Sequence, residues 1–322
     1  MRLKLVPSET KIDFFSTSRL TFSASVLAVL VAIVLFLLIG LNYGIDFRGG
    51  TTIRTESAQP VDVKAYRDAI SPLRLGDVSI SEVFDPTFAE DQNVAMVRIE
   101  AQEGDEAVAV ETINAIEGAL QTIDPEITFP SVESVGPKVS GELIQTAVIA
   151  VILAIGAVLF YIWLRFEWQF AVGAVAALVH DVVITIGIFA VFQIPFDLAI
   201  IAALLTIVGY SLNDTVVVFD RVRENLQKFR KTGLQDVLNM SINETLSRTV
   251  MTSGTTLIAL ISLLVLGGDV IRGFVFAMTL GVIIGTYSSV FVASNILLML
   301  GVKRDWSKPD ANQGNQFGNA DA

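Results

Sequence analysis

The residues best suited to chemistry in this chain are charged side chains that interrupt long apolar runs. Asp214 lies in the apolar run 198–219, and His180 and Asp181 lie near the middle of the run 169–192. As a helix, a run of this length crosses the roughly 30 Å apolar core of a bilayer, where a charged side chain costs about 3 kcal/mol. Charged residues at this depth commonly mark ion pathways and proton relays. The pattern therefore indicates proton or ion handling at these positions.

Asp214 is the hardest of these residues to explain by structure alone. It precedes Asp220 by about 9 Å of helix, so its short side chain does not reach water from that end. Its carboxyl group must be protonated, paired or hydrated in a cavity, and a functional role is favoured. The flanking Asn213 and Thr215 join it as candidate relay residues. Arg248, at the start of the fifth run, is explained equally well by a functional role and by a snorkelling anchor.

Hydroxyl side chains form a stripe after Arg248. Thr249, Thr252, Ser253 and Thr256 recur at positions i, i+3, i+4 and i+7, which places them on one helix face. Such hydroxyls commonly hydrogen-bond a neighbouring helix, so packing is the favoured explanation of the stripe by itself.

His180 and Asp181 are adjacent, and His180 is the only histidine in the chain. A helix turns two adjacent side chains about 100° apart. We therefore predict two separate sites rather than a dyad. For each residue an interhelical hydrogen bond and proton handling both stay open.

Glycines mark a second set of positions. Gly281 and Gly285 form a small-xxx-small face suited to close helix packing. After the first apolar run, the segment GIDFRGG allows a sharp turn with positive φ, which predicts a hinge at the entry to the next domain. The candidate hinge residues are Gly44, Asp46, Arg48, Gly49 and Gly50.

Several kinds of site are disfavoured by what the sequence lacks. It has no cysteine and one histidine, which argues against disulfides, thiolate chemistry and a His-based metal site. It also lacks the G-x-x-x-x-G-K-[ST] nucleotide cradle and the G-x-S-x-G elbow of serine hydrolases. We expect no cofactor, no metal and no enzymatic activity, and we favour ion or proton coupling.

Membrane-spanning helices must position these residues. Hydrophobic residues make up 52% of the 322 and charged residues only 17%, which is typical of a membrane protein. The first apolar run is long for a signal peptide, and the residues after it offer no small-x-small cleavage site. Six transmembrane helices are predicted, at 20–41, 142–164, 169–192, 198–219, 248–267 and 273–300.

Lysine and arginine are distributed unevenly between the two ends of these helices. Segments at one end carry fourteen, and the short loops at the other end carry only Arg272. The first group comprises 1–19, 165–168, 220–248 and the tail from 299; the second comprises 193–197 and 267–272. The positive-inside rule then predicts that both termini are cytoplasmic.

Two of the cytoplasmic segments have their own character. The segment 220–247 is predicted as a cytoplasmic amphipathic loop, and its pattern, followed as far as Thr249, is that of an interfacial helix. The final segment, 301–322, is polar and is expected to be disordered.

The net charge of −11 belongs to one segment. Residues 45–140 hold 18 Asp and Glu against 7 Lys and Arg, and the rest of the chain holds 15 of each. An acidic surface of this kind disfavours nucleic acid and anionic lipid as partners. The segment follows the first span, so 42–141 is predicted as an extracytoplasmic domain.

The pattern within this domain predicts the order β-α-β-β-α-β of a small ferredoxin-like α+β domain. Asp62 is the expected N-cap of its first helix. Strands are expected at 51–55, 78–84, 94–101 and 127–135, and helices at 62–73 and 105–123. The expected buried face of the second helix consists of Ala107, Val110, Ile113 and Leu120. The predicted fold is thus an all-α membrane protein of six spans with an α+β domain inserted between spans one and two.

The chain resembles the SecF family of bacterial protein-export membrane proteins, from residue 1 to about 305. Several long motifs carry the resemblance in one order along the chain. They are GIDFRGG at 44–50, VGPKVSG at 135–141, ALVHD at 177–181, VGYSLNDT at 208–215, FDRVREN at 219–225, TLSRT at 245–249 and a glycine-rich sixth span.

The resemblance implies a proton-driven transporter of the RND superfamily whose full unit has twelve spans, so that a SecD-like subunit supplies the other half. It implies that the pair uses the proton motive force in the bacterial inner membrane to promote late translocation of unfolded preproteins through SecYEG, after SecA has acted. YajC and YidC are further implied components. Carried over by motif, Asp214 is the proton-responsive acid and Arg248 its basic partner.

Two main functions compete with this one, and an intramembrane hydrolase is a distant third because the sequence lacks nucleophile–base pairs and metal clusters. A small-molecule or lipid efflux pump of the same superfamily usually has twelve spans in one chain and a second outer domain, and this chain has neither. A passive assembly factor predicts that Asp214→Asn is harmless.

Overall fold

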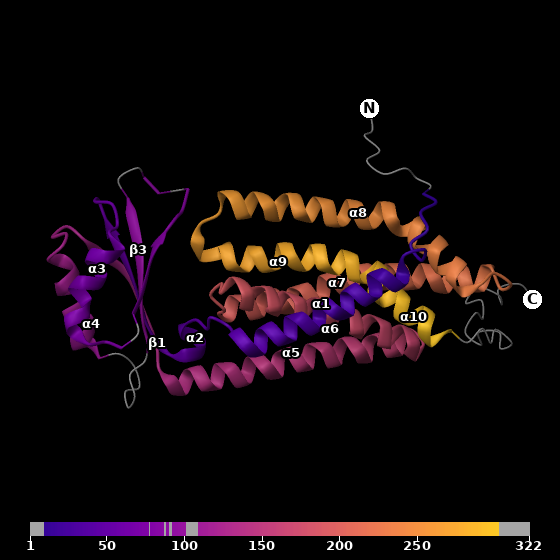
Figure 1. Ribbon diagram of the computed structural model, residues 1–322, viewed down its shortest axis with the longest axis horizontal. Coiled ribbons are helices and arrows are strands. Elements are labelled where there is room, and N and C mark those ends of the chain that lie inside the picture. The colour runs from indigo at the N-terminus through magenta and orange to yellow at the C-terminus, as the bar shows by residue number, and fades with distance from the viewer. Residues whose placement is uncertain (1–9, 77, 87, 90–91, 101–108, 303–322) are drawn as a thin grey trace, which may run out of the picture.

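The computed structural model describes residues 10–302, apart from residue 77, residue 87, residues 90–91 and residues 101–108. Long helices form a bundle, and a small sheet domain lies at one end of it (Figure 1). Six helices of the described part are long and apolar enough to cross a membrane, in agreement with the number of predicted spans. The first five are α1 (Ser18–Ile39), α5 (Pro137–Arg165), α6 (Trp168–Phe192), α7 (Leu198–Lys228) and α8 (Leu234–Leu266).

The sixth span is not a continuous α-helix. It runs from α9 (Asp269–Ser288) through a π-helical turn, η2 (Ser289–Ala293), into α10 (Ser294–Leu300). A π-turn widens the helix by one residue and redirects the side chains around it, and such turns are frequent at functional sites. The sequence showed no signal for it.

Helices α6, α7 and α9 form the centre of the bundle, and α1, α5 and α8 lie at its periphery. The central helices enclose large side chains such as Phe189 and Phe219, neither of which is exposed. The peripheral helices leave apolar side chains such as Leu37, Ile152 and Ile258 exposed. In a bilayer these side chains face lipid or another protein.

Glycines set the closest contact between the central helices. Gly281 of α9 lies against Ile207 of α7, where an added Cβ would overlap the isoleucine side chain. One turn further on, Gly285 lies against Ser211. Small residues at these positions let the two backbones approach, which is how small-xxx-small faces pack in membranes.

The sheet domain follows α1 and a short helix, α2 (Ile45–Arg48). Its four strands are antiparallel in the order β2-β3-β1-β4. Their bounds are β1 (Gly50–Ser57), β2 (Val78–Val83), β3 (Asn93–Glu100) and β4 (Thr128–Val135). Helices α3 (Val63–Ile70) and α4 (Val110–Gln121) bury Tyr66, Ile116 and Leu120 against one face, below which Ile53 and Val97 are fully enclosed.

The element order β-α-β-β-α-β predicted for this domain is observed. The Asp62 side chain accepts hydrogen bonds from the backbone N–H groups of Lys64 and Ala65 and so caps α3 as expected. A 3₁₀ turn, η1 (Ser71–Leu73), follows α3. The predicted start of the second helix, with Ala107, lies outside the described residues. Within α4 the predicted face was partly wrong, because Val110 is exposed and Ile116 takes its place in the core.

The expectation of an interfacial helix after residue 219 was also wrong. Residues 220–228 continue α7, residues 234–249 begin α8, and a short turn joins them. The apolar side chains of the stretch pack on each other rather than on a membrane surface. Val222 and Leu226 of α7 are buried in one cluster with Val237, Leu238 and Ile242 of α8. The amphipathic pattern thus belongs to a helical hairpin. The predicted disordered tail lies outside the described residues from position 303 onward.

Candidate functional site: two buried carboxylates in the helix bundle

Asp214 points into the bundle from α7, where the side chain is almost fully buried. Its two carboxylate oxygens accept one hydrogen bond each: Oδ1 from the Thr249 hydroxyl at 2.7 Å, Oδ2 from the Ser289 hydroxyl at 3.3 Å. The donors come from α8 and from η2, so this one side chain joins three spans. A buried carboxylate needs such donors because burial removes it from bulk solvent.

Arg248 does not pair with Asp214 in this structure, although the family resemblance implied that it would. Arg248 is exposed, and the described part of the chain offers it no ion pair. Adjacent helix residues point about 100° apart, so when Thr249 faces Asp214 its neighbour faces outward. In this structure Thr249, the next residue along α8, makes the direct contact to Asp214, and the role of Arg248 as basic partner stays a prediction.

Asp181 forms a second buried carboxylate on α6, with no exposed side-chain surface. It accepts hydrogen bonds from the hydroxyls of Ser211 at 2.6 Å and Ser288 at 2.8 Å. Its Oδ1 lies 2.9 Å from Nδ1 of His180. Like Asp214, this residue ties three spans together through short polar contacts.

His180 and Asp181 are a pair, which corrects the prediction of two separate sites. The Cβ atoms of adjacent helix residues diverge, but an imidazole ring is long enough to turn back toward its neighbour's carboxylate. The other ring nitrogen of His180, Nε2, is buried without a hydrogen-bond partner among the described residues. The ring also stacks on Tyr287, with centroids 6.2 Å apart.

The two carboxylates are linked by consecutive residues of the sixth span. Ser288, the last residue of α9, donates to Asp181, and Ser289, the first residue of η2, donates to Asp214. Sequence reasoning missed both serines, together with Ser211. The available signal was the presence of hydroxyl side chains inside the fourth and sixth apolar runs.

The remaining predicted relay residues divide between this site and ordinary packing. Thr215 is buried, but its hydroxyl donates to the Ser211 carbonyl of its own helix. Asn213 is exposed. Of the hydroxyl stripe, Ser253 contacts Thr286 at 2.7 Å, while Thr252 and Thr256 donate to carbonyls of α8 itself.

The glycine-rich linker joins the bundle to the sheet domain through several polar contacts. The Gly44 N–H donates to the Phe196 carbonyl at 2.8 Å, and the Asp46 carboxylate accepts from the N–H of Leu198 at 3.0 Å. Asp46 thus helps to cap α7, the helix that carries Asp214. Gly49 and Gly50 have φ angles of 75° and 128°, which a side chain would strain, and they turn the chain into β1.

The last of the hinge candidates, Arg48, pairs with Glu100 at 2.7 Å on the domain surface, where both side chains are about half exposed. An exposed pair of this kind contributes little to stability. Asp46 and the glycines therefore define the geometry of the linker more than Arg48 does.

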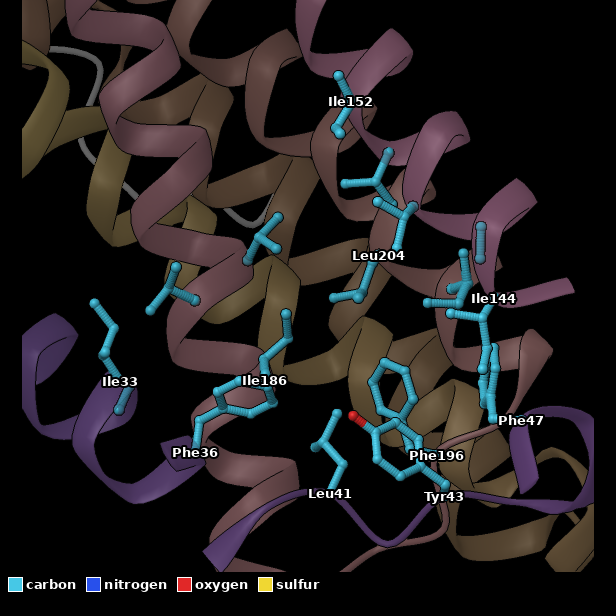
Figure 2. A pocket seen from close by; sticks show the side chains of 17 residues that line it. Ile33, Phe36, Leu41, Tyr43, Phe47, Ile144, Ile152, Ile186, Phe196 and Leu204 are labelled. Atoms are coloured by element: carbon cyan, nitrogen blue, oxygen red, sulfur yellow. The ribbon is translucent and has the colours of Figure 1, made fainter. Parts of the chain in front are cut away.

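An apolar cavity of about 630 Å³ lies near the linker, between α1, α5, α6 and the start of α7. Ile33, Phe36, Ile144, Ile186 and Leu204 line it (Figure 2). Among the described residues that line it, only Tyr43 has a polar side-chain atom. This lining can hold an apolar group but provides no acid or base to move a proton. The described residues include no cluster of three His, Cys, Asp or Glu side chains that could hold a metal ion.

Comparisons with known proteins agree with this architecture. Residues 115–303 match the family described as protein export membrane protein SecD/SecF, C-terminal, and residues 34–61 match the SecD/SecF GG motif. The protein translocase subunit SecF of Cereibacter sphaeroides is 64% identical over 321 residues, covering 100% of this chain and 99% of the relative. The SecF of Rhodobacter capsulatus is 59% identical over 315 residues, covering 96% and 95%.

A longer relative and a solved structure extend the comparison. The protein translocase subunit SecDF of Brucella abortus is 40% identical over 304 residues, which cover 94% of this chain but 39% of the relative. The crystal structure of SecDF from Thermus thermophilus superposes with a TM-score of 0.81 at 34% identity, covering 92% of this chain and 39% of that one. This chain therefore corresponds to a part of the longer SecDF proteins. By its sequence and its fold, it belongs to the SecD/SecF family of protein export membrane proteins.

Proposed function

We propose that this chain is the SecF-type subunit of the bacterial Sec protein-export machinery and that it couples the proton motive force to late preprotein translocation. The observation that carries the assignment to export is the 64% identity to a SecF translocase subunit across the whole of both chains. The observation that supports coupling is Asp214, a buried carboxylate held by hydroxyls from two other spans.

The chemistry proposed at Asp214 is a change in hydrogen bonding on protonation. An ionised carboxylate only accepts hydrogen bonds, so the Thr249 and Ser289 hydroxyls must both point at it. A protonated carboxyl group also donates, so at least one hydroxyl must turn away or find another acceptor. One elementary charge that crosses 100 mV yields about 2.3 kcal/mol, which matches one or two such hydrogen bonds. Repacking of α7, α8 and η2 follows from that exchange.

We further infer that the sheet domain is a ferredoxin-like extracytoplasmic domain, that both termini are cytoplasmic and that the membrane is the bacterial inner membrane. The fourteen-to-one distribution of Lys and Arg in the flanking segments supports this orientation. In Figure 1 the domain lies at the end of the bundle opposite the turns that join α5 to α6 and α7 to α8. The domain would then be placed to contact a preprotein that leaves the channel.

A SecD-type subunit is the proposed obligate partner. The region that matches this chain makes up 39% of the length of the relatives named SecDF. The rest of each polypeptide is long enough to contain a second half. Apolar side chains exposed on α1, α5 and α8 provide surface for such a half. SecYEG, SecA, YajC, YidC and the unfolded preprotein complete the proposed set of partners.

Translocation of a secretory preprotein into inverted inner-membrane vesicles tests the proposal. Vesicles from cells depleted of this chain should lose the uncoupler-sensitive part of translocation and keep the ATP-driven part. Resupply of the chain together with its SecD-type partner should restore it. If depleted vesicles keep their full response to the uncoupler, the proposed function is wrong.

A further inference from the structure

The sheet domain touches the bundle at a second place, far along the chain from the glycine-rich linker. The carboxylate of Asp269, at the start of α9, accepts a hydrogen bond from the N–H of Phe84 at 2.6 Å. In return the Asp269 N–H donates to the Phe84 carbonyl at 3.1 Å. The Arg272 guanidinium lies over the Phe84 ring, 5.7 Å from its centroid, and pairs with Asp269. We call this reciprocal contact the latch.

The latch and the linker hold the domain at two separated points. The chain enters the sheet at β1 and leaves it at β4, whereas Phe84 follows β2, the edge strand at the other side. A cleft of about 690 Å³ lies between the sheet and the ends of the spans. Arg54, Arg98 and Glu133 line it from the sheet, and Asp197 and Arg272 line it from the spans. A domain held at both sides cannot open this cleft unless one attachment releases.

The latch has the properties of a contact that can release. Phe84 is 60% exposed, and it belongs to none of the apolar clusters that the described residues form. Two hydrogen bonds and one ring contact join Phe84 to α9, and the ion pair between Asp269 and the half-exposed Arg272 lies within α9 itself. Polar contacts at an exposed position exchange readily with water. The linker, by contrast, is continuous chain and cannot release.

Helix α9 joins the latch to the buried carboxylates. Asp269 begins the helix, and Ser288, which donates to Asp181, ends it about 29 Å further along. Ser289 follows and donates to Asp214. A rigid helix transmits a shift at one end to the other, and the π-turn at Ser289 is where a change at the carboxylates acts on it.

We propose that the Phe84–Asp269 latch is a releasable attachment of the sheet domain, and that α9 opens and closes it in response to the hydrogen bonding of Asp214. This inference rests on the proposed function, because it takes protonation of Asp214 as the driving event. In this proposal α9 transmits the change at Asp214 to the latch, and Asp269 is a positioning residue that holds Phe84.

An engineered disulfide across the latch gives the direct test. An added Cβ at Gly268 would lie 3.3 Å from the Cβ of Asp85, close to the roughly 3.5–4.5 Å of disulfides. Gly268 has φ −74° and ψ 169°, a conformation open to cysteine, and the chain has no native cysteine. The variant is therefore Asp85→Cys/Gly268→Cys in the full chain with its SecD-type partner. The matched controls with one cysteine are Asp85→Cys and Asp85→Ala/Gly268→Cys, because in Gly268→Cys alone the added Cβ would overlap the Asp85 carboxylate.

We expect the double variant to cross-link when inverted vesicles are oxidised with diamide. Cross-linked vesicles should lose the uncoupler-sensitive part of preprotein translocation, and dithiothreitol should restore it. The controls with one cysteine should not form the cross-link, and neither diamide nor dithiothreitol should change their translocation. Failure to cross-link would show that the latch contact is absent. A cross-linked protein with full uncoupler-sensitive translocation would show that release is not required. Either result overturns the proposal.

A second measurement tests transmission through α9. The rate of cross-linking in the double cysteine variant is compared between energised and uncoupled vesicles, with and without the further substitution Asp214→Asn. We expect the two rates to differ when Asp214 is present and to be equal in the Asp214→Asn background. The same difference in both backgrounds, or no difference in either, would overturn the role of α9. The proposed function fails by another readout, namely a full uncoupler response of translocation in vesicles depleted of this chain.

Discussion

Ser288 and Ser289 are neighbours in the chain, yet their hydroxyls bind two different carboxylates on two different helices. Ser288 donates to Asp181 at 2.8 Å, and Ser289 donates to Asp214 at 3.3 Å. The α-helix ends and the π-turn begins between them. This arrangement makes the two acids parts of one hydrogen-bonded unit.

Asp214→Asn should remove the uncoupler-sensitive part of translocation and leave the ATP-driven part. Asparagine keeps the size and an acceptor oxygen for Thr249 but cannot gain or lose a proton. Protein level and co-purification with the SecD-type partner should therefore stay normal. Asp220→Asn, six residues further along α7 at an exposed position, is the matched control and should behave as the parent protein. Full uncoupler sensitivity of Asp214→Asn vesicles at normal protein level would make Asp214 a structural residue.

Thr249→Val should reduce uncoupler-sensitive translocation, and Thr249→Ser should retain most of it. Valine matches the shape of threonine but leaves Asp214 without its shorter hydrogen bond, whereas serine keeps the hydroxyl. A hydrogen bond to a charged group contributes about 1.5–3 kcal/mol, so stability should fall by a similar amount. Thr252→Val is the control, because that hydroxyl bonds to its own helix. Equal effects at the two threonines would contradict the assignment.

Asp181→Ala should lower the thermal stability of the protein. The change leaves the Ser211 hydroxyl and a ring nitrogen of His180 without their acceptor in a buried site, while Ser288 keeps its hydrogen bond to the Gly285 carbonyl. Each unsatisfied group costs roughly 1–3 kcal/mol, so a drop of several degrees in Tm is expected for detergent-solubilised protein. Ser211→Ala should recover part of the loss in the Asp181→Ala background, because it removes the orphaned hydroxyl. A Tm unchanged by Asp181→Ala would argue that the site is hydrated.

Arg248→Met should change the free energy of unfolding by less than about 0.5 kcal/mol, because the side chain is exposed and has no ion pair among the described residues. We nevertheless expect it to lower uncoupler-sensitive translocation, since the family resemblance assigns it to Asp214 during the cycle. The double variant with Asp214→Asn should then be no worse than either single one. Additive losses would place Arg248 outside the Asp214 unit.

Asp197 should give the protein a measurable pH dependence. It precedes α7 at the end of the bundle next to the sheet domain, and burial raises its pKa. Nearby Asp46 raises the pKa further, whereas the hydrogen bond from the Ile200 N–H lowers it. A carboxyl group whose pKa is higher in the folded state binds its proton more tightly there. Its contribution to stability is therefore present at low pH and is lost as the pH rises through the folded pKa.

The measurement is the Tm as a function of pH for the parent protein and for Asp197→Asn. Asparagine still caps α7 but does not ionise, so the variant should lose less stability as the pH rises. Asp46→Asn should act in the same direction and more weakly. Parallel curves for the parent protein and Asp197→Asn would show that the carboxyl group has its ordinary pKa.

Much of the fold follows from local sequence. Apolar runs long enough to cross a bilayer must form helices, because no water is present to satisfy an exposed backbone, so the six spans were predictable from composition alone. Within the domain, period-two strands and the Asp62 cap act over a few residues and were correctly predicted. The same reasoning identified Asp214 and Asp181 as acids that require buried partners.

The identity of those partners was decided by the tertiary structure. The contacts to the acids join residues far apart in the chain: Thr249 and Ser289 lie 35 and 75 positions from Asp214, and Ser288 lies 107 positions from Asp181. The periodicity of a sequence predicts neighbours within one helix or strand and cannot predict contacts at such separations. Burial also changed two local interpretations. The amphipathic stretch after residue 219 packs its two halves together as a hairpin of α7 and α8, and His180 turns back to Asp181 inside the bundle. Local sequence shows which groups need a partner, whereas helix packing determines which partner lies within reach of a hydrogen bond.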